Sequence, residues 1–340
     1  MSTTDAERRD RTTLAMLASE AGVSLSTISK VLNGHTDVAP STRQRVERLL
    51  DQHAYRRRGA AARGSSLLEL VFSDLANPWG SEIMTGVQAI AHQDGMSLVL
   101  SPSGEKHAPG PDWLRGALQR KPAGVLLVST DPTPLLRERL RARNIPFAVI
   151  DPAGELPPGV PSVGSTNWAG GMAATRHLIE LGHTRIAAVS GLTHMLCSWA
   201  RLDGYRSAMA SAGLPVRDDW VHMGDFLQTG GRAAAERLFA LDEPPTAVFA
   251  GNDVQALGVI EVATARGLRV PEDVSVVGYD DTQVAVWARP SLTTVHQPIR
   301  RMAEEATRIV LRLAAGQHVE QQRLELATHL VVRDSTARPA

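Results

Sequence analysis

Residues 14–33, LAMLASEAGVSLSTISKVLN, decide how the rest of the chain is interpreted. Apolar side chains recur at helical spacing on both sides of Gly22, which predicts two short amphipathic helices joined by a tight turn. The second helix presents Leu25, Ser26 and Lys30 on its outer face, with no acid beside them. This pattern is typical of a helix-turn-helix, whose second helix enters the major groove of DNA.

The composition fits a globular protein with an uneven charge distribution. The chain has 340 residues, 43% hydrophobic and 21% charged, so two or three folding units are expected. Residues 1–65 carry 11 Lys and Arg against 7 Asp and Glu, and the remainder carries 25 against 29. A basic head on an acidic body suits a polyanionic partner for the head alone.

Cysteine usage and hydropathy favour a cytoplasmic protein. The single cysteine, Cys197, excludes an intrachain disulfide and is typical of a reducing compartment. Residues 1–11 are polar and lack the apolar segment of a secretory signal. Because no apolar run approaches 18 residues, we expect no transmembrane helix.

The head is predicted to contain three helices followed by a linker. Residues 1–11 form a flexible tail, and Thr13 is a plausible N-cap of the first helix. A third helix is expected from Pro40 to about Tyr55. The basic, alanine-rich residues 56–64 are interpreted as a linker that could fold into one or two helical turns against an anion.

From Leu67 onward, short apolar runs alternate with helical segments, which predicts parallel sheets covered on both faces. The pattern breaks near 160–167 and then runs again, which indicates two α/β lobes. The expected strands are 68–74, 98–101, 124–129, 147–151, 186–190, 247–250, 274–279, 292–297 and 324–333. The expected helices are 80–93, 112–120, 135–143, 169–181, 201–212, 230–241, 254–266 and 298–315.

These patterns predict an all-α head and a two-lobed α/β core with crossed connections. The expected units are a head over 1–55, a linker over 56–66 and a core over 67–340. Within the core, the first lobe takes about 67–163 and 296–322, and the second takes about 164–292 and 323–335. Ligands of such folds bind between the lobes, at the carboxyl ends of the strands.

Several motifs in the same order resemble the lac-repressor (LacI/GalR) family of transcription regulators. The resemblance covers the chain from Thr13 to about Asp334. It is carried by the segments 23–33, PSTR (40–43), LGHTRI (181–186), RLDGY (201–205), VVGYDD (276–281) and PSLTTVHQP (290–298). It implies a helix-turn-helix head, a hinge, and a core like that of periplasmic sugar-binding proteins. It also implies a homodimer on a pseudo-palindromic DNA operator.

The resemblance implies that the second helix of the head reads the operator. Leu25 and Ser26 would meet base edges, and Lys30 could donate to guanine, whereas the hydroxyls and amide around them suit phosphates. Ser24 could also serve as a helix N-cap, and the arginines of the linker could be solvated. The candidate DNA contacts are Thr13, Ser24, Leu25, Ser26, Thr27, Ser29, Lys30, Asn33, Arg56, Arg57, Arg58 and Arg63.

One feature of the linker departs from the family pattern. Members of the family insert a leucine of the hinge helix into the minor groove, and counting from Tyr55 that position falls on Gly64. Gly59 and Gly64 each weaken a helix by up to about 1 kcal/mol. Either Leu67 or Leu68 takes the wedge role in a shifted hinge, or the DNA is bent less.

The resemblance also implies an effector site between the lobes. Arg201 would grip the effector through paired donors, Asp280 would accept bonds from ligand hydroxyls, and aromatic faces would stack on a sugar ring. Structural alternatives remain, since Asp280 could cap a loop, Arg201 could form a core ion pair, and the aromatic residues could be core. The candidate effector residues are Trp79, Arg201, Phe226, Asn252, Asp280 and Gln297.

Together these features favour a DNA-binding regulator, most simply a repressor, controlled by a sugar or oligosaccharide. The alternative is a solute-binding protein of the same core fold, which the head and the absent signal segment disfavour. The nucleotide-binding and serine-hydrolase motifs are absent, and no nucleophile is paired with a base, so an enzyme is not expected. His177, His183 and His194 lack a metal-ligand pattern, and neither a metal nor a cofactor is expected.

Overall fold

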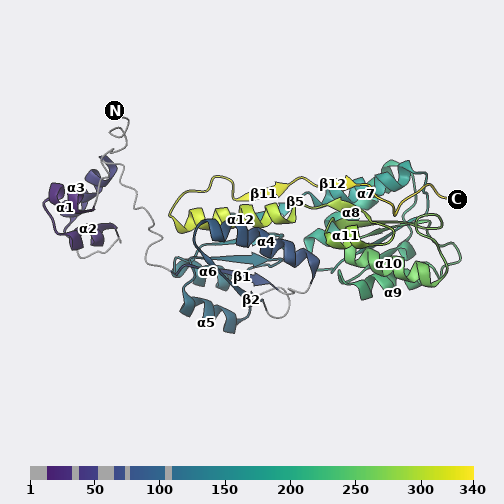
Figure 1. Cartoon of the computed structure of the whole chain (residues 1–340), viewed down its shortest axis with the longest axis horizontal. Coiled ribbons are helices and arrows are strands. Elements are labelled where there is room, and N and C mark those ends of the chain that lie inside the picture. Colours follow the sequence, from purple (N-terminus) through teal and green to yellow (C-terminus); the bar gives the residue numbers. More distant parts are fainter. Residues whose placement is uncertain (1–13, 33–37, 53–64, 73–76, 104–108) are drawn as a thin grey trace, which may run out of the picture. The chain divides into compact units, whose positions relative to one another are not determined.

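The computed structural model describes residues 14–32, 38–52, 65–72, 77–103 and 109–340. The chain divides into two compact units, Met1–Gly64 and Ser65–Ala340 (Figure 1). The first unit contains the helix-turn-helix stretch, and the second contains both α/β lobes.

The head unit contains three helices, α1 (Leu14–Ala21), α2 (Leu25–Leu32) and α3 (Pro40–Gln52). Gly22 adopts a φ of 63°, which lets the chain turn between α1 and α2. The hydroxyl of Ser24 then accepts a hydrogen bond from the Thr27 amide at 3.1 Å and so caps α2. The helices enclose a small apolar core of Leu17, Ala18, Ala21, Ile28, Val31, Val38 and Val46. The expected helix-turn-helix and third helix are confirmed over the described residues.

The first lobe is built on a six-stranded sheet in which every pair of neighbours is parallel. Its strands, in spatial order, are β11 (Arg323–Leu326), β5 (Ser162–Ser165), β4 (Phe147–Ile150), β3 (Gly124–Val128), β1 (Leu67–Phe72) and β2 (Ser97–Pro102). Strands β3 and β4 are fully buried, as expected for a parallel sheet that is covered on both faces.

Helices cover both faces of this sheet (Figure 1). Helices α4 (Pro78–Gln93) and α12 (Ile299–Ala314) pack on one face around Leu70, Ile83 and Met302. Helices α5 (Pro111–Arg120) and α6 (Pro134–Ala142) cover the other face. Helix α12 follows most elements of the second lobe in the chain, so the first lobe is built from two separate stretches of sequence.

The second lobe repeats this plan. Its sheet runs β12 (His329–Val331), β10 (Thr293–His296), β9 (Ser275–Asp280), β8 (Ala247–Ala250), β6 (Ile186–Ser190) and β7 (Val221–Met223), and only the β10–β12 pair is antiparallel. The helices around it are α7 (Asn167–Glu180), α8 (Leu196–Ser211), α9 (Gln228–Leu238), α10 (Asp253–Ala265) and the short α11 (Gln283–Trp287). A 3-10 turn, Asp218–Trp220, precedes β7.

Helices α7 and α8 approach each other closely, and this fixes the position of Arg201. A Cβ atom at Gly171 would collide with the carbonyl of Arg201, and one at Gly204 would collide with the carbonyl of Trp168. Glycine at both positions therefore lets the two helix backbones touch. As a result the start of α8 lies against the start of α7, at the boundary between the lobes.

The described chain passes between the lobes after β5, after β10 and after β11. We expected 323–335 to belong wholly to the second lobe, and this expectation was wrong for β11, which pairs in parallel with β5 of the first lobe. The expected single strand 324–333 is in fact two strands in two sheets. The apolar alternation through Leu324, Leu326 and Leu330 does not mark the point at which the chain crosses between them.

Three short elements were not expected from the sequence. Strand β5 contains mostly serine and glycine, β7 has three residues, and α11 has five, so none of them gives a clear periodic signal. Within the described residues, no helix combines the length and the apolar character needed to cross a bilayer.

Candidate functional site

A cavity of about 310 Å³ lies between the two lobes, at the carboxyl ends of their strands. The first lobe supplies the ends of β1, β3 and β4 and the start of α4, and the second supplies loops after β6 to β9 and the start of α8. The lining residues are Phe72, Asn77, Trp79, Ser129, Asp151, Leu192, Met195, Cys197, Arg201, Asp225, Phe226, Leu227, Asn252 and Asp280.

The backbone of this cavity is strained. Ser129, Asp151, Phe226 and Asp280 all line it, and all four adopt a positive φ, from 47° at Ser129 to 106° at Asp280. Residues other than glycine rarely adopt such angles, and the strain is typical of binding sites whose surroundings hold the chain in place. The strained turns aim polar groups from three different strand ends into one space.

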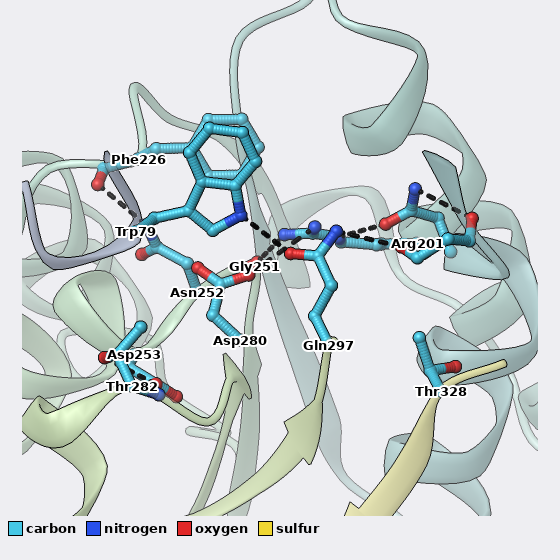
Figure 2. A network of polar contacts seen from close by, with 12 residues as sticks. Trp79, Arg201, Phe226, Gly251, Asn252, Asp253, Asp280, Thr282, Gln297 and Thr328 are labelled. Carbon is cyan, nitrogen blue, oxygen red and sulfur yellow. Dashed lines mark hydrogen bonds and ion pairs between the residues drawn. The ribbon is translucent and has the colours of Figure 1, made fainter. Parts of the chain in front are cut away.

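Arg201 is the centre of a polar network at the cavity wall (Figure 2). Its Nε donates to Asn167 at 2.8 Å, one terminal nitrogen donates to the Gly251 carbonyl at 2.7 Å, and the other lies 3.6 Å from Asp280. The guanidinium also lies 3.7 Å from the ring centroid of Tyr279. Burial alone would lower the pKa of Arg201, but Asp280 and the neighbouring groups raise the pKa above its ordinary value. Arg201 is therefore a fixed positive charge.

Asp280 offers an unsatisfied acceptor to the cavity. The residue is 5% exposed, and its Oδ1 atom forms no hydrogen bond with another described residue, although it lies 3.6 Å from Arg201. Burial raises the pKa of Asp280, and the charge of Arg201 opposes this rise. Buried acceptors in native proteins normally have a donor. An oxygen left without one, on the wall of a cavity, is suited to a hydrogen-bond donor from a ligand.

Two aromatic side chains flank the polar network from opposite lobes. Trp79, at the start of α4, stacks on Phe72 with ring centroids 6.0 Å apart. Its indole nitrogen donates to Gln297 at 2.8 Å, which fixes the ring (Figure 2). Phe226 comes from the second lobe, where Gly191 leaves room for its ring. The centroid of the Phe226 ring lies 5.7 Å from the Cζ atom of Arg201.

The structure gathers five of the six candidate effector residues around the cavity. Asn252 lines it, but its oxygen caps α10 by accepting from Gln255 and its amide donates to the Phe226 carbonyl. Gln297 does not line the cavity. It lies behind Trp79, is 1% exposed, and joins Trp79 to Ser165 through bonds of 2.8 and 2.9 Å. Its place is therefore at the crossings between the lobes.

Asp151 and Ser129 are among the polar residues of the cavity that the sequence did not indicate as effector contacts. Asp151 follows the buried strand β4, and burial raises its pKa while Arg201 opposes the rise. Ser129 follows β3 in the same way. The available signal was positional, because each is the first polar side chain after an apolar strand, at the edge where parallel sheets bind ligands.

Beneath the cavity, Asp253 is buried with three donors. One carboxylate oxygen accepts from the Thr294 hydroxyl at 2.6 Å, and the other accepts from the amide and hydroxyl of Thr282. Burial nevertheless raises the pKa of Asp253 to about 7. An unfolded aspartate titrates near 4, so the folded chain binds this proton more tightly than the unfolded chain does.

This shift predicts a pH dependence of stability that Asp253→Asn removes. The contribution of Asp253 to the free energy of unfolding is fully present below pH about 4. It is lost as the pH rises through about 7. We expect the melting temperature of the unchanged protein, measured by calorimetry from pH 5 to 8, to fall relative to that of Asp253→Asn. Parallel pH profiles for the two proteins would contradict the assignment, whatever the offset between them.

The head presents the expected surface on α2. Leu25 is 55% exposed, and Ser24, Ser26 and Lys30 are also exposed, while Thr27 is half-buried. The Ser24 hydroxyl lies 2.7 Å from that of Ser26 and 2.9 Å from that of Thr27. Ser24 therefore combines a capping role with a place on the exposed surface, as considered from the sequence. Ser29 lies within α2.

The remaining candidate DNA contacts lie outside the described residues. They are Thr13, Asn33, Arg56, Arg57, Arg58 and Arg63. The position of Gly64, on which the wedge question depends, lies outside them as well.

Family models match the head and much of the second half of the chain, and curated relatives match nearly all of it. Residues 13–58 match the model described as bacterial regulatory proteins, lacI family, and residues 175–336 match a periplasmic binding protein-like domain. The HTH-type transcriptional regulator CelR of Thermobifida fusca is 38% identical, over 97% of this chain and 99% of that protein.

Solved structures agree with this relationship. A transcriptional regulator CelR–cellobiose complex is similar with a TM-score of 0.73 and 36% identity, covering 96% of this chain and all of that one. The lac repressor dimer bound to operator and the anti-inducer ONPF gives a TM-score of 0.69 and 27% identity with the same coverage. The chain, with its helix-turn-helix head and two-lobed core, therefore belongs to the lacI family of bacterial regulatory proteins and is a DNA-binding transcriptional regulator.

Proposed function

We propose that the chain is a cytoplasmic, non-catalytic repressor whose homodimer binds a pseudo-palindromic operator and releases it when a carbohydrate fills the cavity between the lobes. The observation that carries this proposal is the buried Asp280 oxygen, which lacks a hydrogen-bond donor beside the fixed charge of Arg201. A similar solved structure is a CelR–cellobiose complex, so cellobiose, a β-linked glucose disaccharide, is the first ligand to test.

The chemistry of the cavity matches a sugar. Hydroxyl groups can donate to the carboxylates of Asp280 and Asp151 and accept from Arg201. The faces of Trp79 and Phe226 offer apolar surface to the C–H groups of a pyranose ring. A site that pairs hydroxyls discriminates strongly against analogues that lack them, because its own buried groups would then be unpaired.

The exposed face of α2 supports the DNA half of the proposal. Leu25 offers a methyl-bearing surface suited to thymine, and Lys30 carries a positive charge suited to guanine or phosphate. Each head reads one half-site, so two heads are needed for a palindrome. The lac repressor, a structural neighbour, is seen as a dimer on its operator.

A network behind the cavity joins the cavity wall to the crossings between the lobes. Trp79 is bonded to Gln297, Gln297 is bonded to Ser165, and these last two stand where the chain passes between the lobes. A ligand that contacts both lobes stabilises the arrangement in which those contacts form. The first lobe begins directly after the linker, so its rotation changes the spacing of the two heads in a dimer.

The test is operator binding by the full-length protein with and without sugar. Anisotropy is measured on labelled DNA from upstream of the gene that encodes this chain, in the presence of cellobiose, of glucose and of guanine as a non-sugar control. Saturating cellobiose is expected to raise the operator Kd about 5- to 150-fold, the usual range of coupling between two sites. Guanine is expected to have no effect.

Two outcomes would count against the proposal in different ways. Absence of sequence-specific binding to any upstream segment removes the operator role. A sugar that raises the melting temperature of the protein, and so binds its native state, but leaves operator affinity unchanged removes the coupling.

A further inference from the structure

A second cavity, of about 630 Å³, adjoins the first one. Asp151 and Cys197 line both cavities, so the two spaces meet at these residues. One wall of the second cavity comes from the first lobe, through β5, β11 and the loop after β4. The other wall comes from the starts of α7 and α8 in the second lobe.

Two tryptophans of the second lobe are exposed in this cavity. Trp168 is 46% exposed and Trp199 is 40% exposed, although indole rings are usually well buried in a folded protein. The indole nitrogen of Trp199 donates to the Thr193 carbonyl at 2.6 Å, which holds the ring in one orientation. A fixed and exposed aromatic face is a preformed surface for an apolar ligand face.

Carboxylates surround these rings. Asp203 lies one helical turn beyond Trp199, on the same side of α8, and it lines the cavity together with Glu155 and Glu325 of the first lobe. Asp203 has an ion-pair partner in Arg206 at 3.3 Å, whereas the side chains of Glu155 and Glu325 bond to no other described residue. The second cavity therefore repeats the chemistry of the first, with aromatic faces beside carboxylates that can accept hydrogen bonds from hydroxyl groups.

The boundary between the cavities is an interlobe contact that opening of the lobes would release. The Leu196 amide donates to the Ala153 carbonyl at 2.9 Å, and Met195 and Cys197 pack against Ala153. Burial raises the pKa of the Cys197 thiol to about 12, so this thiol is uncharged where it lines the two cavities. In this structure the contact separates the two cavities, so an oligosaccharide that occupies both must displace it.

We propose that the second cavity is an outer subsite, which takes the further sugar units of an oligosaccharide whose first units occupy the inner cavity. This inference rests on the proposed carbohydrate function. Trp168 and Trp199 stack on the outer rings, and Asp203, Glu155 and Glu325 accept from their hydroxyls. The outer subsite makes the regulator selective for chain length as well as for sugar identity.

The test is calorimetric titration of the full-length protein with cellobiose and its β-1,4-linked homologues of three to five glucose units. Affinity is expected to rise about tenfold from the disaccharide to the longer chains, as for a few aromatic contacts, with one oligosaccharide bound per chain. Trp168→Ala and Trp199→Ala should each lose most of this gain and leave the Kd for cellobiose unchanged.

Trp287→Ala is the matched control, because Trp287 is 70% exposed and lines neither cavity. It should keep the full gain with chain length. Equal affinities for two and for five units, two cellobiose molecules per chain, or a gain that survives both test substitutions would overturn the outer subsite. In each of these cases cellobiose still binds, so the proposed function stands. Failure of every one of these saccharides to bind would instead remove the proposed function and this inference with it.

Discussion

Replacing Arg201 with methionine is expected to lower the free energy of unfolding of the core by about 3–5 kcal/mol and to abolish sugar binding. Methionine fills much of the space but offers no donors. Asp280 and the acceptors on Asn167 and Gly251 would then be left buried without their partner. Lysine cannot replace arginine here. The three acceptors lie around the planar guanidinium group, and a single ammonium group does not reach all of them. Guanidinium unfolding and titration with cellobiose measure the two effects.

The loss of stability in Arg201→Met should also depend on pH. Without the positive charge, nothing opposes the effect of burial on Asp280, so the pKa of that carboxyl rises further. Protonation then relieves the buried charge, and Arg201→Met should be less destabilised at pH 5 than at pH 8. Arg206→Met is the control on the same helix, since its ion pair with Asp203 is exposed and should contribute less than about 1 kcal/mol. Equal stabilities of the two variants would refute a central role for Arg201.

The parts of the fold that were predictable are those with a strong local pattern. The turn at Gly22 and the cap at Ser24 depend on residues next to one another, so the sequence indicates them directly. The buried strands β3 and β4 are continuous apolar runs between helices. The crossing after β11 is different, because strand pairing depends on partners about 160 residues away and leaves no local trace.

The candidate site shows the same division between local and distant causes. Arg201 and Asp280 stand in motifs that could be recognised along the chain, and the structure brings them to 3.6 Å. Gln297 stands in such a motif too, yet its side-chain amide is hydrogen-bonded to Trp79 and Ser165. These partners are distant in sequence, so only the folded structure shows the bonds. The strained backbone at Ser129 and Asp151 is likewise imposed by tertiary packing.

Replacing Asp280 with asparagine is expected to give a repressor that binds its operator normally and responds poorly to sugar. Asparagine keeps the size of the side chain and tolerates the φ of 106° at this position. It removes the negative charge of the carboxylate, which accepts hydrogen bonds from the hydroxyl groups of the sugar. A hydrogen bond to a charged group contributes about 1.5–3 kcal/mol. The sugar concentration that releases half of the operator should therefore rise roughly 10- to 150-fold, in the anisotropy assay with cellobiose.

The same assay separates loss of sugar binding from damage to the core. Asp273→Asn removes a half-buried carboxylate that pairs with Arg269 away from both cavities, and it should respond to sugar as the unchanged protein does. Asp280→Asn should match both proteins in operator Kd before sugar is added, because Asp280 lies in the core unit and α2 lies in the head unit. If Asp280→Asn releases DNA at the same sugar concentration as Asp273→Asn, the unsatisfied carboxylate oxygen is not where the effector binds.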